Sequence, residues 1–270
     1  MYSKIRRKLF VLMGCALLAA GTAGCSSSEK ELYLEESPEV IYNLGYNALS
    51  AGDLKNAAKL FNEVERQHPY SVWALQAQLM AAYAYYSSKQ YDDAVLVLER
   101  FIEQHPGNQN VPYAYYLRAI CFYTQIVDVG RDQRNTELAL QSFQEVVGRF
   151  PESPYARDAQ YKLDLIRDHL AGKEMEIGRF YQKQQLYLAA INRFRNVLQN
   201  YQTTGHVPEA LHRLTESYLS LGVVDEAQNA AAVLGYNFPG SEWYQDSYKL
   251  LVQSNLKPLR KQNSWLKLIF

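Results

Sequence analysis

Histidine and cysteine are the side chains that could hold a metal or act as nucleophiles in this chain of 270 residues. The five histidines are His68, His105, His169, His206 and His212. His68 and His105 each precede a proline at the same place in a repeated stretch, which favours a structural role. His206 and His212 are six residues apart, whereas two ligands on one helical face need a spacing of about four. With no metal spacing, no GxSxG, no glycine-rich phosphate loop and no isolated carboxylate pair, the sequence predicts neither a metal site nor a catalytic site.

Cys25 is the cysteine whose surroundings predict a modification. It follows the basic stretch MYSKIRRK, twelve apolar or small residues (LFVLMGCALLAA) and GTAGC. This order is typical of a secretory signal peptide, and the apolar run is too short to span a bilayer. A buried N-terminal helix is the alternative. TAGC resembles a bacterial lipobox, although Thr22 stands where an aliphatic residue is usual. Cys15 also fits loosely, but it would leave too short a signal.

We therefore expect cleavage before Cys25, which would carry N-acyl and S-diacylglycerol chains and no other cofactor. Several acyl chains on one residue give stable membrane anchoring. Ser26 follows the cysteine, and no aspartate stands where many lipoproteins carry an inner-membrane retention signal. The resemblance to a lipobox therefore implies the periplasmic face of the outer membrane. Cys121 would then be the remaining thiol, so no internal disulfide is expected.

The charge balance argues against nucleic acid as a partner. The whole chain has 28 basic and 28 acidic residues. Residues 1–24 contain four basic side chains and no acids, so the expected mature chain has 24 basic against 28 acidic residues. A nucleic-acid footprint needs a basic face.

Tyrosine is the residue type most suited to binding here, with 22 copies. The motif YAYY occurs twice and supplies Tyr83, Tyr85, Tyr86, Tyr113, Tyr115 and Tyr116. Tyrosine offers contact area at low entropic cost and can hydrogen-bond a peptide backbone. Tyr85 and Tyr116 fit positions that pack between helices. We expect Tyr83, Tyr86, Tyr113 and Tyr115 to be candidates for a peptide-binding groove.

The elements that would position these side chains are repeated helical hairpins. Alanine opens the second helix of each unit at Ala57, Ala94, Ala139, Ala190 and Ala227, at intervals of 37, 45, 51 and 37 residues. Large apolar residues follow four and seven positions later in most units, and proline closes four of the five. No unit can bury its apolar face alone, so the units must stack. The pattern is that of the tetratricopeptide repeat, lengthened from 34 residues to 37.

Two intervals exceed 37 residues. The extra eight residues of the third unit fall at about 128–135 (DVGRDQRN), where charge and glycine predict a solvated loop between two helices. The extra fourteen lie between Pro151 and Gly178. Helical spacing continues there, from Ala156 to Leu170, so we expect the first helix of the fourth unit to be lengthened by about four turns.

The sequence thus predicts an all-α solenoid of about five tetratricopeptide-type repeats. The segments are a lipoprotein signal peptide (1–24), a lipidated tether (25–37), repeats at about 38–74, 75–111, 112–154, 155–204 and 205–241 with a final helix up to 257, and a basic, apolar tail (258–270). In the tail, Trp265, Leu266, Ile269 and Phe270 would contact a partner or the membrane surface, or else cap the last repeat.

Taken together, these features resemble the BamD family. The lipoprotein signal, the five repeats, YAYY in the second unit and GRDQRN in the third carry the resemblance, which covers nearly the whole mature chain apart from the tail. BamD-like proteins are non-enzymatic scaffolds of the β-barrel assembly machine in Gram-negative bacteria.

The resemblance implies partners as well as a fold. C-terminal repeats would bind the POTRA domains of the barrel component BamA, and N-terminal repeats would bind unfolded outer-membrane β-barrel clients. Other Bam lipoproteins are further candidate partners. A family arginine that faces BamA corresponds to Arg193 in AAINRFRNV, and Arg131 and Asp132 are candidate contacts of the third-unit insert. An ordinary solvated charge is the alternative for Arg193.

Two rival functions follow from the same features. A periplasmic repeat adaptor that coordinates cell-wall synthesis or division would share the architecture, because fold does not fix function. A lipoprotein enzyme acting on envelope polymers would need an acid, base or nucleophile arrangement that the sequence does not offer.

Overall fold

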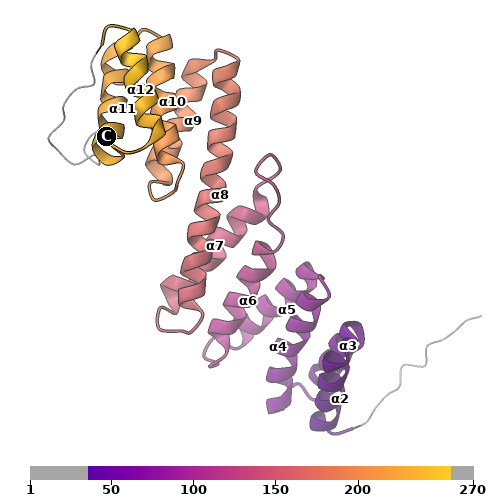
Figure 1. Cartoon of the computed structure of the whole chain (residues 1–270). Coiled ribbons are helices and arrows are strands. Elements are labelled where there is room, and N and C mark those ends of the chain that lie inside the picture. The colour runs from indigo at the N-terminus through magenta and orange to yellow at the C-terminus, as the bar shows by residue number, and fades with distance from the viewer. Residues whose placement is uncertain (1–35, 257–270) are drawn as a thin grey trace, which may run out of the picture. The chain divides into compact units, whose positions relative to one another are not determined.

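The structure is a computed structural model in which residues 36–256 are described. Over this range the chain forms eleven α-helices and no strand, which confirms the predicted all-α class (Figure 1). The helices are α2 (Pro38–Ser50), α3 (Leu54–Gln67), α4 (Val72–Ser87), α5 (Tyr91–Gln104), α6 (Val111–Tyr123), α7 (Arg134–Arg149), α8 (Ala156–Lys183), α9 (Tyr187–Asn200), α10 (Val207–Ser220), α11 (Val224–Asn237) and α12 (Glu242–Gln253). The predicted signal peptide, Cys25, most of the tether and the tail 258–270 lie outside the described residues.

The helices pack as a tetratricopeptide-type solenoid. Each helix from α2 to α11 contacts the next helix along the chain, and several first helices also contact the first helix of the following unit (α2 with α4, α4 with α6, α8 with α10, α10 with α12). Figure 1 shows this order from the indigo N-terminal helices to the yellow α12. Packing only against near neighbours is the behaviour expected of a repeat protein.

The repeated sequence positions form the core. In every unit the opening alanine and the residues four and seven positions after it are fully buried. They are Ala57, Phe61, Val64; Ala94, Leu98, Phe101; Ala139, Phe143, Val146; Ala190, Phe194, Val197; and Ala227, Ala231, Leu234, all with 0 % of their surface exposed. The periodic pattern in the sequence is therefore the core pattern of the molecule.

Small residues on first helices let the second helices approach closely. A Cβ added to Gly45 of α2 would stand 2.9 Å from Cε1 of Phe61, and one added to Gly178 of α8 would stand 2.4 Å from Cε1 of Phe194. Both distances are shorter than a van der Waals contact. The two phenylalanine rings thus occupy the space that a side chain would need.

Both departures from the period are visible in the helices. The insert forms the connection between α6 and α7, residues 124–133, and its last two predicted residues instead begin α7 at Arg134. α8 has 28 residues where the other helices have 12 to 16, so the expected lengthening by about four turns is confirmed. The helix continues through Gly172 without interruption.

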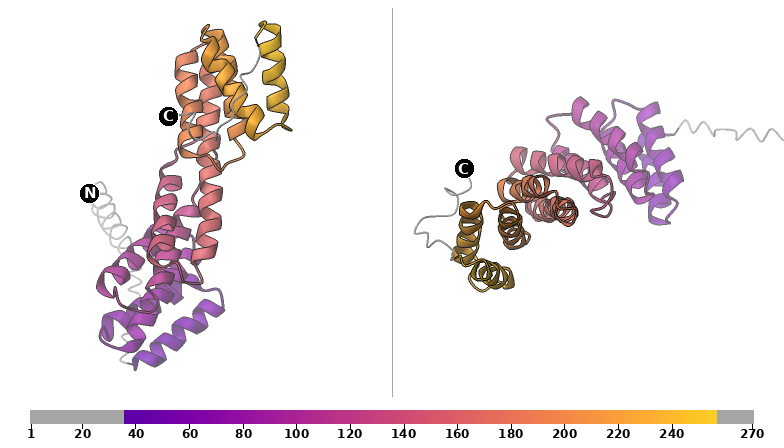
Figure 2. Two further views of the ribbon diagram at one scale, coloured as in Figure 1. Left: turned by 90° about the vertical axis from the view of Figure 1, so that its left-hand side faces the viewer. Right: turned by 90° about the horizontal axis from the view of Figure 1, so that it is seen from above.

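The long helix α8 connects two hydrophobic cores. Leu163, Ile166 and Leu170 belong to a core shared with α4–α7, whereas Ala171 and Met175 belong to a core shared with α9–α11. A third cluster joins α2, α3 and α4. Figures 1 and 2 show α8 extending from the helices around α7 to the helices around α9 and α10.

Candidate partner-binding surfaces

Three of the predicted groove tyrosines lie together on α4 and α6. Tyr83 is 41 % exposed, and its ring centroid lies 6.4 Å from that of Tyr86. Burial, and then the nearby Tyr155, Tyr83 and Tyr86 hydroxyls, together raise the pKa of Tyr113 to about 12. Tyr113 also packs on Tyr155, with ring centroids 5.7 Å apart. These rings form a row, here called the tyrosine row, from α4 across α6 to the start of α8.

Tyr115 does not belong to this row, and its assignment to the groove is wrong. Only 7 % of its surface is exposed, and its ring centroid lies 5.3 Å from that of Phe150. Nη1 of Arg149 donates a hydrogen bond to its hydroxyl at 3.1 Å, and Arg118 stacks over the ring. Because Tyr113 and Tyr115 are two residues apart on a helix, their side chains leave α6 on different sides. Tyr115 is a packing residue.

Tyr85 and Tyr116 pack between helices, as the alternative predicted. The hydroxyl of Tyr85 accepts a hydrogen bond from the Asn62 amide at 2.8 Å, and that of Tyr116 donates to Asp158 at 2.5 Å. Burial, then the hydrogen bond and the negative charge of Asp158, raise the pKa of Tyr116 well above its ordinary value. Tyr116 thereby joins α6 to α8, and its ring stacks on that of Tyr155, with centroids 5.1 Å apart.

Arg193 lies on α9 and contacts Glu174 of α8. Its Nη1 donates to Oε1 and Oε2 of Glu174 at 3.4 and 3.3 Å. The arginine side chain is 41 % exposed and that of Glu174 is 16 % exposed. The predicted partner-binding arginine is therefore accessible, and it is also an intramolecular ion-pair partner.

The insert presents Arg131 and Asp132 to solvent on a connection that is held by local hydrogen bonds. The Asp128 carboxylate accepts from the backbone N–H of Gly130 at 2.9 Å. The side-chain amide of Gln133 donates to the carbonyl oxygens of Asp128, Val129 and Arg131 at 2.9 to 3.4 Å. Any contact of Arg131 or Asp132 with a partner remains a prediction.

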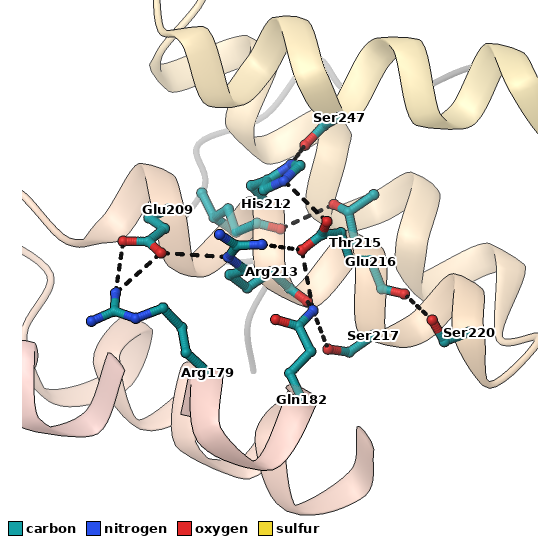
Figure 3. Close-up of polar contacts among 11 residues, drawn as sticks. Arg179, Gln182, Glu209, His212, Arg213, Thr215, Glu216, Ser217, Ser220 and Ser247 are labelled. Atoms are coloured by element: carbon teal, nitrogen blue, oxygen red, sulfur yellow. Dashed lines mark hydrogen bonds and ion pairs between the residues drawn. The ribbon is translucent and has the colours of Figure 1, made fainter. Parts of the chain in front are cut away.

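A polar network joins α8, α10 and α12 (Figure 3). Arg179 and Arg213 both donate to Glu209, and Arg213 also donates to Glu216 at 2.8 Å. The buried ring of His212 lies between Ser247 of α12, with Nδ1 at 2.8 Å from Oγ, and Glu216, with Nε2 at 3.5 Å from Oε1. Here every carboxylate is shared between at least two donors, so the network fixes the C-terminal helices to one another.

Within residues 36–256, no three histidine, cysteine or acidic side chains are grouped to hold a metal ion. Burial raises the pKa of the Cys121 thiol to about 12, so this cysteine is not a reactive nucleophile at neutral pH. None of the helices in the same range combines the length and the apolarity that a membrane span requires.

Comparison with known proteins decides the family. A family model described as an outer membrane lipoprotein, YfiO, matches residues 34–234. The outer membrane protein assembly factor BamD of Caulobacter vibrioides is 49 % identical over 92 % of this chain and 82 % of that protein. This chain belongs to the BamD family. BamD of Rickettsia prowazekii is 46 % identical over 87 % of this chain and 95 % of that protein. BamD of Neisseria meningitidis serogroup A is 34 % identical over 89 % of this chain and 94 % of that protein.

The sequence did not predict several residues that belong to these surfaces. Tyr155 completes the tyrosine row in this BamD-family chain but lies 39 residues after the second YAYY motif. Glu174 precedes Arg193 by 19 residues and belongs to another helix. Contacts of this kind have no local sequence signal, since only the stacking of hairpins brings them together.

Proposed function

We propose that this BamD-family chain is a non-enzymatic scaffold in the assembly of outer-membrane β-barrel proteins. Membership of the family carries the proposal, since each curated relative named above is an outer membrane protein assembly factor. The solenoid suits such a role because stacked hairpins offer extended surfaces without an enclosed catalytic cavity.

The chain would act from the periplasmic face of the outer membrane, held there by the lipid on Cys25. In the C-terminal repeats, the accessible guanidinium of Arg193 would pair with a carboxylate on a POTRA domain of BamA. In the N-terminal repeats, the tyrosine row would bind extended segments of unfolded β-barrel clients through ring contacts and hydroxyl hydrogen bonds. Other Bam lipoproteins would join the same scaffold.

Affinity purification from detergent-extracted membranes tests this function. A tagged chain should recover BamA in near-stoichiometric amounts, and Arg193→Ala should reduce that recovery. Recovery of peptidoglycan synthases without BamA would instead support the cell-wall adaptor. A matched chain with Cys25→Ser should remain in the membrane-free fraction if the lipid is the anchor.

A further inference from the structure

The turns that join α8 to α9 and α10 to α11 expose large apolar side chains. Leu186 and Leu188, in the first turn and at the start of α9, are 54 % and 70 % exposed. Leu221 and Val223, in the second turn, are 39 % and 41 % exposed. Phe180, in the last turn of α8, is 60 % exposed. These five side chains are here called the apolar turn residues.

The corresponding turns of the first two hairpins carry small or polar residues instead. Their sequences are SAGD at residues 50–53 and SSKQ at residues 87–90. The turns of the last two hairpins have the sequences QQLYL at residues 184–188 and SLGVV at residues 220–224. Exposed leucine and valine are thus a feature of the C-terminal turns and not of the turn as such.

Two of these apolar residues stand where a helix cap is expected. The N-cap of the second helix is Asp53 in the first hairpin, but Leu186 and Val223 in the last two. Asp53 accepts a hydrogen bond from the backbone N–H of Asn56 at 3.3 Å, whereas leucine and valine are among the least favourable N-caps. Because Leu186 and Val223 neither cap a helix nor bury their side chains, they favour a contact outside the chain.

Both turns lie at the end of the molecule where the C-terminal tail begins. The Gln182 amide of α8 donates to Oγ of Ser217 of α10 at 3.3 Å, as Figure 3 shows. Nδ1 of His212 of α10 lies 2.8 Å from Oγ of Ser247 of α12. Each contact joins residues 35 apart, so α8, α10 and α12 lie side by side in one register and end together. The chain therefore leaves α12 beside the apolar turn residues.

The sequence at this end is basic as well as apolar. Residues 179–188 contain two basic residues and no acidic one, and residues 255–270 contain four basic residues and no acidic one. Asp225 and Glu226 follow the second turn and offset the positive end of the α11 dipole. Apolar side chains together with basic ones are the composition of surfaces that bind the interface of anionic bilayers.

The shape of this end also favours a bilayer over a protein partner. The hollow of about 420 Å³ beside the turns is lined mainly by charged and polar side chains, and by none of the apolar turn residues. These residues thus project from turns, whereas the residues that contribute most to protein–protein binding fill well-packed pockets.

We propose that the apolar turn residues dock on the surface of a bilayer that contains anionic phospholipids. Their side chains enter the headgroup region, and the basic residues of the tail pair with lipid phosphates. The inference rests on the proposed function in one respect, that the chain acts at the outer membrane. The lipid at the N-terminus and the apolar turn residues then hold the chain to the bilayer at two places.

The test measures how the purified mature chain with Cys25→Ser co-sediments with vesicles, because the lipid itself would bind any bilayer. With vesicles of equal parts phosphatidylglycerol and phosphatidylcholine, half of the chain should be bound at about 1 mM lipid. With phosphatidylcholine alone, binding should be roughly tenfold weaker. Deletion of residues 258–270 should remove this preference. The contact is reversible and much weaker than the anchor that the lipid on Cys25 provides.

Leu186→Ser combined with Val223→Ser removes two apolar side chains and supplies two favourable N-caps. Binding to the anionic vesicles should weaken by about 5- to 30-fold. The unfolding midpoint should stay the same or rise, so weaker binding would not reflect unfolding. Leu96→Ser combined with Val72→Ser is the matched control, because these side chains are 66 % and 74 % exposed on α5 and α4. The control should bind vesicles as well as the parent chain.

The outcomes separate the docking surface from the proposed function. The surface is wrong if the Cys25→Ser chain binds neither kind of vesicle, or if the double serine variant of the turns binds as well as its parent. Equal weakening by the control would also overturn it. Normal vesicle binding by the turn variant, with reduced recovery of BamA, would mean that the turns bind a protein. The proposed function itself fails only if the wild-type chain recovers no BamA from membranes.

Discussion

Glu216 and Glu174 show that similar carboxylates have different uses on the C-terminal helices. Glu216 accepts hydrogen bonds from Arg213 and from the Gln182 amide, at 2.8 and 3.1 Å, and faces His212. Glu174 accepts from one arginine nitrogen at longer distances. The first arrangement is closed and stabilises the contact between α8, α10 and α12. The second involves only Nη1 of Arg193 among the donors of residues 36–256.

The carboxyl group of Glu216 should make the free energy of unfolding depend on pH in the acidic range. Burial alone would raise its pKa, but hydrogen bonds from His212 and Arg213 and their charges lower the pKa to about 2. A carboxyl with a lowered pKa in the folded state stabilises the protein above its unfolded pKa, and that stabilisation is lost as the pH falls from about 4.5 towards 2. Glu216→Gln should therefore cost on the order of 2 kcal/mol at pH 7.

Urea unfolding followed by circular dichroism at pH 7, 5, 4 and 3 would check this dependence. The stability gap between wild type and Glu216→Gln should narrow as the pH falls below about 4.5. Asp246→Asn is the control, because its pair with Lys249 is exposed and such pairs contribute only ~0–1 kcal/mol. A gap that stays constant from pH 7 to 3 would contradict the assigned pKa.

At the scale of helices, close approach within a hairpin depends on Gly178. Replacing it with alanine gains about 1 kcal/mol of helix propensity. However, the new Cβ would stand 2.4 Å from the ring of Phe194, which is fully buried and cannot move freely. Overpacking typically costs ~1–3 kcal/mol. We expect Gly178→Ala to lower the free energy of unfolding by up to about 2 kcal/mol.

Gly148 of α7 is the matched control for this substitution. A Cβ added there would meet no atom within 4 Å, so Gly148→Ala should leave stability unchanged or raise it by up to ~1 kcal/mol. Denaturant midpoints of the two variants, measured side by side, would separate packing from propensity. Equal effects of both alanines would mean that the Phe194 ring does not limit the approach of α9.

The end of α12 repeats a turn found inside four other hairpins. Gly52, Lys89, Gln185, Gly222 and Asn255 all have positive φ, between 58° and 81°. In each case the residue after it donates its backbone N–H to the carbonyl oxygen five residues earlier, at 2.8 or 2.9 Å, as Leu256 does to Leu251. This is the Schellman motif. Within the four hairpins, the residues five, nine and twelve positions after the turn residue are fully buried.

The sequence of the tail does not repeat the residue types found at those buried positions, which leads to a prediction about its removal. The corresponding positions after Asn255 are Arg260, Ser264 and Lys267, where the hairpins have alanine and larger apolar residues. We therefore expect deletion of residues 258–270 to change the thermal unfolding midpoint by only about 1–2 °C. Differential scanning calorimetry of both forms would measure it. A large decrease would instead support a tail that caps the last repeat.

Elements were more predictable from the sequence than sites. The alanine and apolar positions predicted the core of every hairpin because each lies a fixed number of residues from the others. The interval of 51 predicted the long α8 for the same reason. The pair of Arg193 with Glu174 and the addition of Tyr155 to the tyrosine row were not predictable, because different helices supply them. The assignment of Tyr115 to the groove was wrong because the motif YAYY places neighbouring tyrosines on different sides of one helix.

Across the whole described chain, α8 is the element shared by the two larger cores. Leu170 packs in the first and Ala171, its neighbour, in the second. Tyr201 also packs against both cores. Burial raises the pKa of Tyr201, and the charges of Glu174 and Glu137 raise it further, so Tyr201 lies near carboxylates of both α8 and α7. Glu174, and with it Arg193, is therefore close to the junction of the cores.

The two cores should lose stability separately, because contacts in a solenoid are limited to near neighbours. Leu98 of α5 and Leu198 of α9 are equally suited to test this, with 0 % and 2 % of their surface exposed. Either leucine replaced by alanine should cost ~2–5 kcal/mol locally. In native-state hydrogen exchange, Leu198→Ala should lower amide protection in α9–α11 and leave α4–α6 at wild-type values, while Leu98→Ala should do the reverse. Equal loss of protection in both groups of helices from either substitution would mean that α8 couples the cores into one cooperative unit. In that case, a partner bound at Arg193 would also stabilise the helices that carry the tyrosine row.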